Sequence, residues 1–291
     1  MYMKRFFVGG ITLYMTLSAC EKKAELNVPY EGDRIVVNSF IQPDSPVYIR
    51  VTKSVPVTVY SEDQFPTLSS AQVHLLENGN DVGVLQWQEI KGKGYFVSKR
   101  PAARGNRYTI KVANEGLTPV EASDTIPAVA TITNAYAQRN ANRVSFLLED
   151  WEGVDNYYRI RLFKADEDAA ALGIIRPKAT VAYRLDPTYN TVFLAELTSS
   201  YYNTLLIGDS RFDGRKIQFV LQTQDVINDK YIIAEISALS ESAYHYLQTA
   251  GSQGGITGLV VSEPTRVFSN VQNGYGIVAG INTRQLLLKV E

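Results

Sequence analysis

The chain has 291 residues, a length that predicts roughly two domains of ~100–200 residues each. Apolar residues make up 45% of the chain and charged residues 20%, a balance that supports a packed core and excludes wholesale disorder. The 29 basic and 30 acidic side chains nearly cancel, which excludes the strongly basic surface of a nucleic-acid-binding protein. A single cysteine excludes an intrachain disulfide and a cysteine-cluster zinc site.

Residues 1–20 have the pattern of a lipoprotein signal peptide. Lys4 and Arg5 precede a mostly apolar stretch, Phe6 to Leu17, that is too short for the ~20 residues of a membrane-spanning helix. The stretch ends in a sequence like a bacterial lipobox: Leu17, Ser18, Ala19 and Cys20. We expect cleavage after residue 19 and lipidation of Cys20, which anchors the chain to a membrane. The alternative is an ordinary signal peptide with a chance cysteine at its end.

Residues 20–33 are expected to form the lipidated cysteine and its tether, and an immunoglobulin-like β-sandwich is expected over 34–126. Apolar and polar residues alternate over 35–40 and 47–52, as they do in half-buried strands. Asn78-Gly79 lies between two such runs and predicts a tight hairpin, because both positions tolerate a positive φ. Short strands separated by frequent turns are typical of a sandwich.

A second, antiparallel β domain with one short helix is expected over residues 130–291. Strand patterns recur at 144–148, 158–162, 217–221, 231–236 and 275–281. Ser240 and Glu241 predict the start of a helix over about residues 240–250, with Gly251 ending it. Residues 165–176 predict one helical turn or a surface insertion. The fold class is therefore mainly β.

Three passages of the chain resemble a family of Bacteroidota lipoproteins defined by a domain of unknown function. They are Arg34–Ile41 with Thr52–Pro56, Phe212–Arg215, and Tyr244–Leu247 with Ser269–Gly276. Proteins of this kind tend to be encoded beside TonB-dependent outer-membrane receptors. The resemblance implies a lipoprotein of the cell envelope with an accessory role in uptake or surface organisation, and it supplies no catalytic residues.

The residue types needed for hydrolytic chemistry are sparse in this sequence. A catalytic triad requires a histidine beside its nucleophile, and His74 and His245 are the only histidines. Neither is near a nucleophile motif, so we interpret both as surface or interdomain residues. Glu149, Asp150 and Glu152 surround Trp151 and provide carboxylates for a hydrolase or a sugar site, or simply the end of a strand. We expect no enzyme activity and no cofactor.

Asp209 to Gly214 resembles the start of a calcium-binding loop. Arg211 and Val220 occupy two positions where such a loop needs oxygen ligands, so a turn with Asp213-Gly214 at its tip is the preferred interpretation. An irregular calcium site near Asp209 and Asp213 stays open.

Paired tyrosines predict that one ring of each pair fills the core while the other faces outward, since neighbouring strand residues point to opposite faces. Trp151, Tyr201 and Tyr202 are the candidate ligand patch, because exposed aromatic rings suit glycans, peptides and proteins. The sequence thus predicts a non-enzymatic lipoprotein of the outer membrane, on its periplasmic or its outer side, that assists a TonB-dependent receptor. The alternative is a stand-alone surface lipoprotein that binds a glycan or a peptide.

Overall fold

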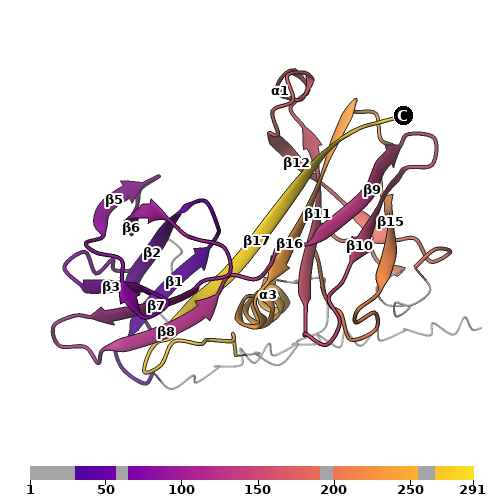
Figure 1. Ribbon diagram of the computed structural model, residues 1–291. Helices are drawn as coiled ribbons and strands as arrows, with labels where there is room; N and C mark the ends of the chain where they lie inside the picture. The colour runs from indigo at the N-terminus through magenta and orange to yellow at the C-terminus, as the bar shows by residue number, and fades with distance from the viewer. Residues whose placement is uncertain (1–29, 57–64, 191–198, 255–265) are drawn as a thin grey trace, which may run out of the picture. The chain divides into compact units, whose positions relative to one another are not determined.

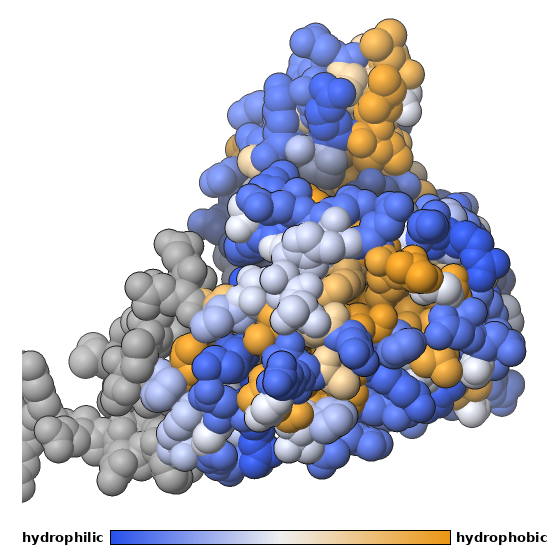
Figure 2. Space-filling model, turned by 90° about the vertical axis from the view of Figure 1, so that its left-hand side faces the viewer, coloured by the Kyte–Doolittle hydropathy of each residue, from blue (hydrophilic) through white to orange (hydrophobic). Residues whose placement is uncertain are grey.

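A computed structural model of the chain describes residues 30–56, 65–190, 199–254 and 266–291. Contacts divide the chain into Met1–Glu31 and Gly32–Glu291, and every element described below belongs to the second unit. Strands dominate this unit, which confirms the expected mainly β fold class (Figure 1). Hydrophilic residues cover most of the face that lies on the left in Figure 1, with apolar areas between them (Figure 2).

One large mixed sheet of nine strands runs through the whole of this unit (Figure 1). Its strands in spatial order are β12 (Pro177–Val181), β11 (Tyr157–Ala165), β16 (Tyr231–Leu239), β17 (Tyr275–Lys289), β1 (Ile35–Ile41), β2 (Pro46–Lys53), β6 (Lys93–Pro101) and β5 (Gln86–Ile90), with β14 (Leu205–Gly208) pairing with β11. Neighbouring strands are antiparallel except for β1 and β17, which run parallel. The parallel pair joins a strand near the start of the described chain to the strand at its end.

Two smaller antiparallel sheets pack against the large one. The first has the order β4 (Asn80–Asp81), β3 (Gln72–Glu77), β7 (Arg107–Ala113) and β8 (Val120–Thr125), and the second has the order β13 (Tyr183–Leu185), β15 (Lys216–Thr223), β10 (Arg143–Glu149) and β9 (Thr131–Gln138). Each encloses a separate apolar core with the large sheet, so the unit contains two β-sandwiches. The hairpin between β3 and β4 has positive φ at Asn78 and Gly79, as expected from the sequence.

Strand β17 contributes to both sandwiches. Val278 lies in the first core and Leu288 in the second. The two residues are an even number of positions apart, so they face the same side of the large sheet. A domain boundary near residues 126–130 stays a prediction, and the last strand contributes side chains to the cores on both sides of it.

Two helices of the described part cover the opposite face of the large sheet. Helix α3 (Glu241–Gly254) packs on Ile277, Ala279 and Ile281 of β17, and the short α1 (Glu167–Ala171) contributes Ala170 to a separate cluster. The Oγ atom of Ser240 accepts a hydrogen bond from the N–H of Ala243 at 3.1 Å and caps α3.

The predicted helix stop at Gly251 is wrong, because α3 continues to Gly254. A glycine destabilises a helix interior by only about 1 kcal/mol relative to alanine, and it ends a helix when it adopts a positive φ. Gly251 has no positive φ, so it does not form that kind of end.

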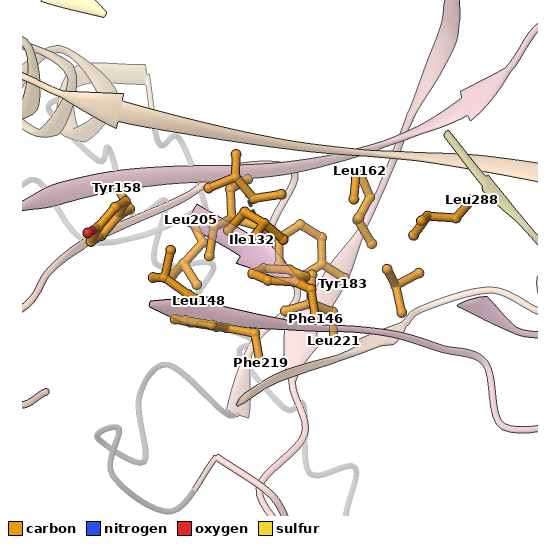
Figure 3. Close-up of a cluster of buried hydrophobic side chains, with 14 of the residues drawn as sticks. Ile132, Phe146, Leu148, Tyr158, Leu162, Tyr183, Leu205, Phe219, Leu221 and Leu288 are labelled. Atoms are coloured by element: carbon orange, nitrogen blue, oxygen red, sulfur yellow. Dashed lines mark hydrogen bonds between the residues drawn. The ribbon is translucent and has the colours of Figure 1, made fainter. Parts of the chain in front are cut away.

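The second core is rich in aromatic side chains from both of its sheets (Figure 3). The rings of Phe146 and Phe219 stack with centroids 5.3 Å apart. Tyr183 is fully buried, and its hydroxyl donates a hydrogen bond of 2.6 Å to the carbonyl of Ile160. Tyr158 lies in this core while its neighbour Tyr157 packs beneath α3 on the other face, as the alternation predicts.

Candidate functional site

The predicted ligand patch of Trp151, Tyr201 and Tyr202 does not form one surface. Trp151 directly follows Asp150 after the end of β10, and the residue is 56% exposed. Tyr202 pairs with Tyr183 of β13 through two backbone hydrogen bonds of 2.7 and 3.0 Å. Tyr201 lies next to it and stacks beneath the guanidinium of Arg184, 5.3 Å from the ring centroid.

The register of β15 shows how far apart these aromatic groups are. Lys216, the first residue of β15, pairs with Glu149 near Trp151, whereas Thr223, the last one, pairs with Tyr183. Seven residues of strand span about 23 Å at ~3.3 Å per residue. Trp151 and the pair of tyrosines therefore belong to opposite ends of the small sheet.

The loop that carries Trp151 is fixed by Asn156. The Nδ2 atom of Asn156 donates hydrogen bonds to the carbonyl of Val154 at 2.6 Å and to that of Trp151 at 3.3 Å. The same side chain and its backbone N–H both donate to Oδ2 of Asp209, at 3.2 and 2.7 Å. The loop is thus held in one conformation even though Trp151 itself is exposed.

Asp150, Asp209 and Asp213 come together below this loop. Each offers a carboxylate oxygen, and these oxygens lie within 4.8 Å of one another. Burial raises the pKa of the Asp209 carboxyl, and the negative charges of Asp150 and Asp213 raise it further, against the hydrogen bonds from Asn156. The sequence placed two of these residues in a candidate calcium loop but did not connect Asp150 with them.

Hydrogen bonds within the protein already engage this acidic cluster. Asp150 accepts from the hydroxyl of Tyr158 at 2.6 Å and from the N–H of Gly214 at 2.9 Å, and Asp213 accepts from the N–H of Gly153 at 2.9 Å. Gly214 has a φ of +68°, which confirms the expected turn at this position. With one oxygen from each, the three carboxylates supply fewer than the roughly 6–8 oxygen ligands that calcium takes. The cluster is therefore accounted for as a hydrogen-bonded turn, and a calcium site here stays a prediction.

A groove of about 440 Å³ lies beside the Trp151 loop, which forms part of its lining. Its walls come from the end of β8, the crossover that follows it, the Trp151 loop, the end of β16 and the start of α3. Trp151, Tyr157 and Leu239 give it an apolar lining, and the charged side chains along it are Asp124, Asp155 and Glu241. These elements are far apart in the sequence, so no local motif indicated the groove.

The two histidines lie in different parts of the fold. The Nδ1 atom of His74 is 3.4 Å from Oδ2 of Asp81 on the exposed β3–β4 hairpin. His245 lies on α3, where its ring packs 5.7 Å from that of Phe268 and its Nε2 atom is 3.7 Å from Glu241. Within the described residues, neither ring has a hydrogen bond to a serine or threonine hydroxyl. The expected lack of enzyme activity stays a prediction.

The lipobox residues Leu17, Ser18, Ala19 and Cys20 lie outside the described residues, as does most of the tether over 20–33. No helix in the described part is both long enough and apolar enough to cross a bilayer.

Comparison with known families places most of the chain in one of them. The model described as "Domain of unknown function (DUF4249)" matches residues 21–286, and the chain belongs to this family. No curated protein matches the chain. The resemblance to a domain-of-unknown-function family is thus confirmed, while the bacterial group and the neighbouring receptor genes stay predictions.

Proposed function

We propose that this DUF4249 protein is a lipid-anchored binding protein of the bacterial outer membrane that assists a TonB-dependent receptor and catalyses no reaction. The observation that carries the proposal is the sequence Leu17-Ser18-Ala19-Cys20, which places the only cysteine of the chain at the end of a short apolar segment. The match to the family begins at residue 21, directly after this cysteine.

The physical basis of the anchor is the burial of fatty-acid chains. Each buried methylene contributes ~0.8 kcal/mol, so that one chain binds a membrane marginally and two or more bind it stably. A cysteine that carries a diacylglycerol and an acylated amine has three chains. It holds the folded unit at the membrane without any spanning segment.

Membrane fractionation of a Cys20→Ser variant tests the anchor. We expect wild-type protein in the detergent-soluble membrane fraction, with a mass that lacks residues 1–19 and includes the lipid. The variant is expected to keep its uncleaved signal peptide and to carry no lipid. Lys22→Ser is the matched control and should behave as wild type. Normal maturation of the Cys20→Ser variant, or an unmodified thiol on the wild-type protein, contradicts the proposal.

The receptor partnership is supported by the resemblance to envelope lipoproteins encoded beside TonB-dependent receptors. It is tested by crosslinking in the native host, extraction in detergent and mass spectrometry of what is recovered with the lipoprotein. We expect a TonB-dependent outer-membrane receptor in near-stoichiometric amount. Recovery of the lipoprotein as a monomer without such a partner contradicts this part of the proposal.

The second candidate function is a stand-alone binding protein for a glycan or a peptide, with no receptor partner. The exposed ring of Trp151 beside a groove favours it, because aromatic rings in concave sites are frequent ligand platforms. A ligand array with the full chain in detergent separates the two functions: saturable binding without any receptor in the crosslinking experiment supports this second one.

A further inference from the structure

We infer that the groove beside Trp151 is a binding site for a cationic peptide segment, with an arginine side chain stacked on Trp151 between the carboxylates of Asp155 and Glu241. The inference deepens the proposed binding role and rests on it, but it does not depend on the lipid anchor. Four properties of the groove support it.

The first property is its size and its lining. A volume of about 440 Å³ lies within the ~300–1,000 Å³ of typical ligand sites. Leu239 is buried in the cluster beneath α3, and Trp151 and Val154 are more than half exposed at the groove. An aliphatic side-chain stem placed here removes apolar surface from water on both partners.

The second property is the sign of the charge along the groove. The charged side chains among its lining residues are Asp124, Asp155 and Glu241, and none of the described lining residues is lysine, arginine or histidine. Neighbouring acids and burial also raise the pKa of the Tyr157 hydroxyl, with burial as the larger cause. A cationic ligand is therefore favoured here over an anionic one.

Asp124 and the two rim acids have different roles. Asp124 accepts hydrogen bonds from the N–H groups of Thr125 and Gly280, at 2.8 and 3.1 Å, and from the Ser240 hydroxyl. It is engaged within the fold and also balances the positive end of α3. Asp155 and Glu241 are exposed, and among the described residues Glu241 forms an ion pair of 3.7 Å with His245. These two rim carboxylates are the ones available to a ligand.

The third and fourth properties are rigidity and the type of aromatic platform. Asn156 fixes the loop of Trp151, and the Tyr157 ring stacks on Tyr244 with centroids 4.6 Å apart. A preformed site loses less entropy on binding. A guanidinium group stacks on an indole face and binds carboxylates through its planar set of donors, so arginine matches this combination better than lysine does.

Intrinsic fluorescence of the full chain in detergent provides a direct test. The chain has two tryptophans, and Trp87→Phe leaves Trp151 as the only one, which is excited selectively at wavelengths that tyrosine does not absorb. The probe is the peptide acetyl-(Gly-Arg)₃-amide, and its control has citrulline, which is neutral and nearly isosteric, in place of arginine. We expect a saturable change with the arginine peptide, binding that weakens as salt increases, and affinity about tenfold lower for the citrulline peptide.

Two variants decide whether the rim carboxylates are responsible. Asp155→Asn with Glu241→Gln should lower the affinity for the arginine peptide about tenfold, because both charge-assisted contacts are lost. Glu89→Gln with Glu115→Gln changes the net charge equally at exposed positions away from the groove and should leave the affinity unchanged. An unchanged thermal midpoint in both double variants shows that the fold is intact.

Three results would overturn the inference. They are equal affinity for the arginine and citrulline peptides, equal loss of affinity in the two double variants, and saturable quenching by maltoheptaose but not by the arginine peptide. The last result assigns the groove to a neutral glycan. None of them bears on Cys20, so failure here and failure of the lipid anchor remain distinguishable.

Discussion

Asp124 accepts a hydrogen bond from the hydroxyl of Ser240, which lies 116 residues further along the chain. Ser240 at the same time caps α3, and Asp124 also accepts from the N–H of Gly280 in β17. One carboxylate thus joins the end of the first sandwich to the helix and to the strand that both sandwiches share. The half-buried position of Asp124 makes these hydrogen bonds more valuable than they would be in water.

We expect Asp124→Ala to lower the free energy of unfolding by about 1–3 kcal/mol, because the Ser240 hydroxyl and the N–H of Gly280 lose their hydrogen-bond acceptor. Asp124→Asn keeps one acceptor oxygen and should lose less. Chemical denaturation monitored by circular dichroism measures both. Glu115→Gln, at an exposed position, is the control, and an Asp124→Ala variant as stable as this control contradicts the expectation.

Gly280 allows β17 to lie directly against the crossover that leads from the first sandwich to the second. A Cβ atom at this position would lie 2.2 Å from the carbonyl oxygen of Thr125. The strand is therefore closer to the crossover than any residue with a side chain would permit. We expect Gly280→Ala to destabilise the fold by about 1–3 kcal/mol through forced displacement of that backbone.

Gly251 is the matched control for this substitution. It lies within α3, and a Cβ atom there would meet nothing within 4 Å. Gly251→Ala should therefore stabilise the protein by about 0.5–1 kcal/mol, since alanine is the better helix former. Thermal denaturation of the two variants measures the contrast. Equal shifts of the midpoint in the same direction would show that the close contact at Gly280 is unimportant.

The local patterns in the sequence were sufficient to predict most strands, but not their partners over long distances. Alternation identified the strands around Val37, Ile49 and Phe146, and Asn78-Gly79 identified a hairpin, because each depends on neighbours in the chain. The parallel pairing of β1 with β17 joins residues at opposite ends of the chain. Neither strand carries a local signal that specifies its partner.

The same limit applies to the candidate sites. Trp151, Tyr201 and Tyr202 share a chemical character, but the register of β15 places them at opposite ends of a sheet. Asp155 and Glu241 line one groove although the sequence separates them widely. Residue type predicted candidate groups, and only the strand registers and the helix packing determined which of them meet.

The lowered pKa of Glu77 predicts that the free energy of unfolding decreases in acid. Hydrogen bonds from Tyr108 and Asn106 hold the pKa of the Glu77 carboxyl below its ordinary value of 4.5. Because the folded state favours the ionised form, this contribution is complete above pH 4.5 and is lost as the pH falls through the lower folded value. Glu77→Gln should flatten the pH dependence of the unfolding free energy in this window. An unchanged slope in this variant contradicts the assignment.

The raised pKa of Asp124 predicts that the free energy of unfolding depends on pH with the opposite sign. Burial raises the pKa of its carboxyl above the ordinary value of 3.8, against the hydrogen bonds from Ser240, Thr125 and Gly280. The folded state therefore favours the protonated form, and stability decreases as the pH rises from 3.8 through the higher folded value. Denaturation of Asp124→Asn across this window should show that this decrease is absent. Persistence of the full decrease in the variant would assign it to other carboxylates.

Glu235 is the acidic centre of a polar cluster on the helix-covered face of the large sheet. Its Oε1 atom accepts from Nε of Arg161 at 2.8 Å, and its Oε2 atom accepts from Gln285 at 2.8 Å. Arg159 lies 3.6 Å from the same carboxylate. The side chain of Glu235 is 6% exposed. Removal of its carboxylate therefore leaves the guanidinium groups of Arg159 and Arg161 close together with little solvent to screen their charges.

We expect Glu235→Ala to lower the free energy of unfolding by about 3 kcal/mol, because a partly buried charge cluster loses the carboxylate that balances Arg159 and Arg161. The control is Glu121→Ala, which removes the 3.3 Å ion pair with Lys111 at a site where both side chains are about half exposed. Exposed pairs contribute about 0–1 kcal/mol, so this change should be small. Urea denaturation of both variants at low and high salt measures the difference. If the two losses are equal, or if salt abolishes the loss at Glu235, the cluster is as well hydrated as a surface ion pair and the large sheet does not depend on it.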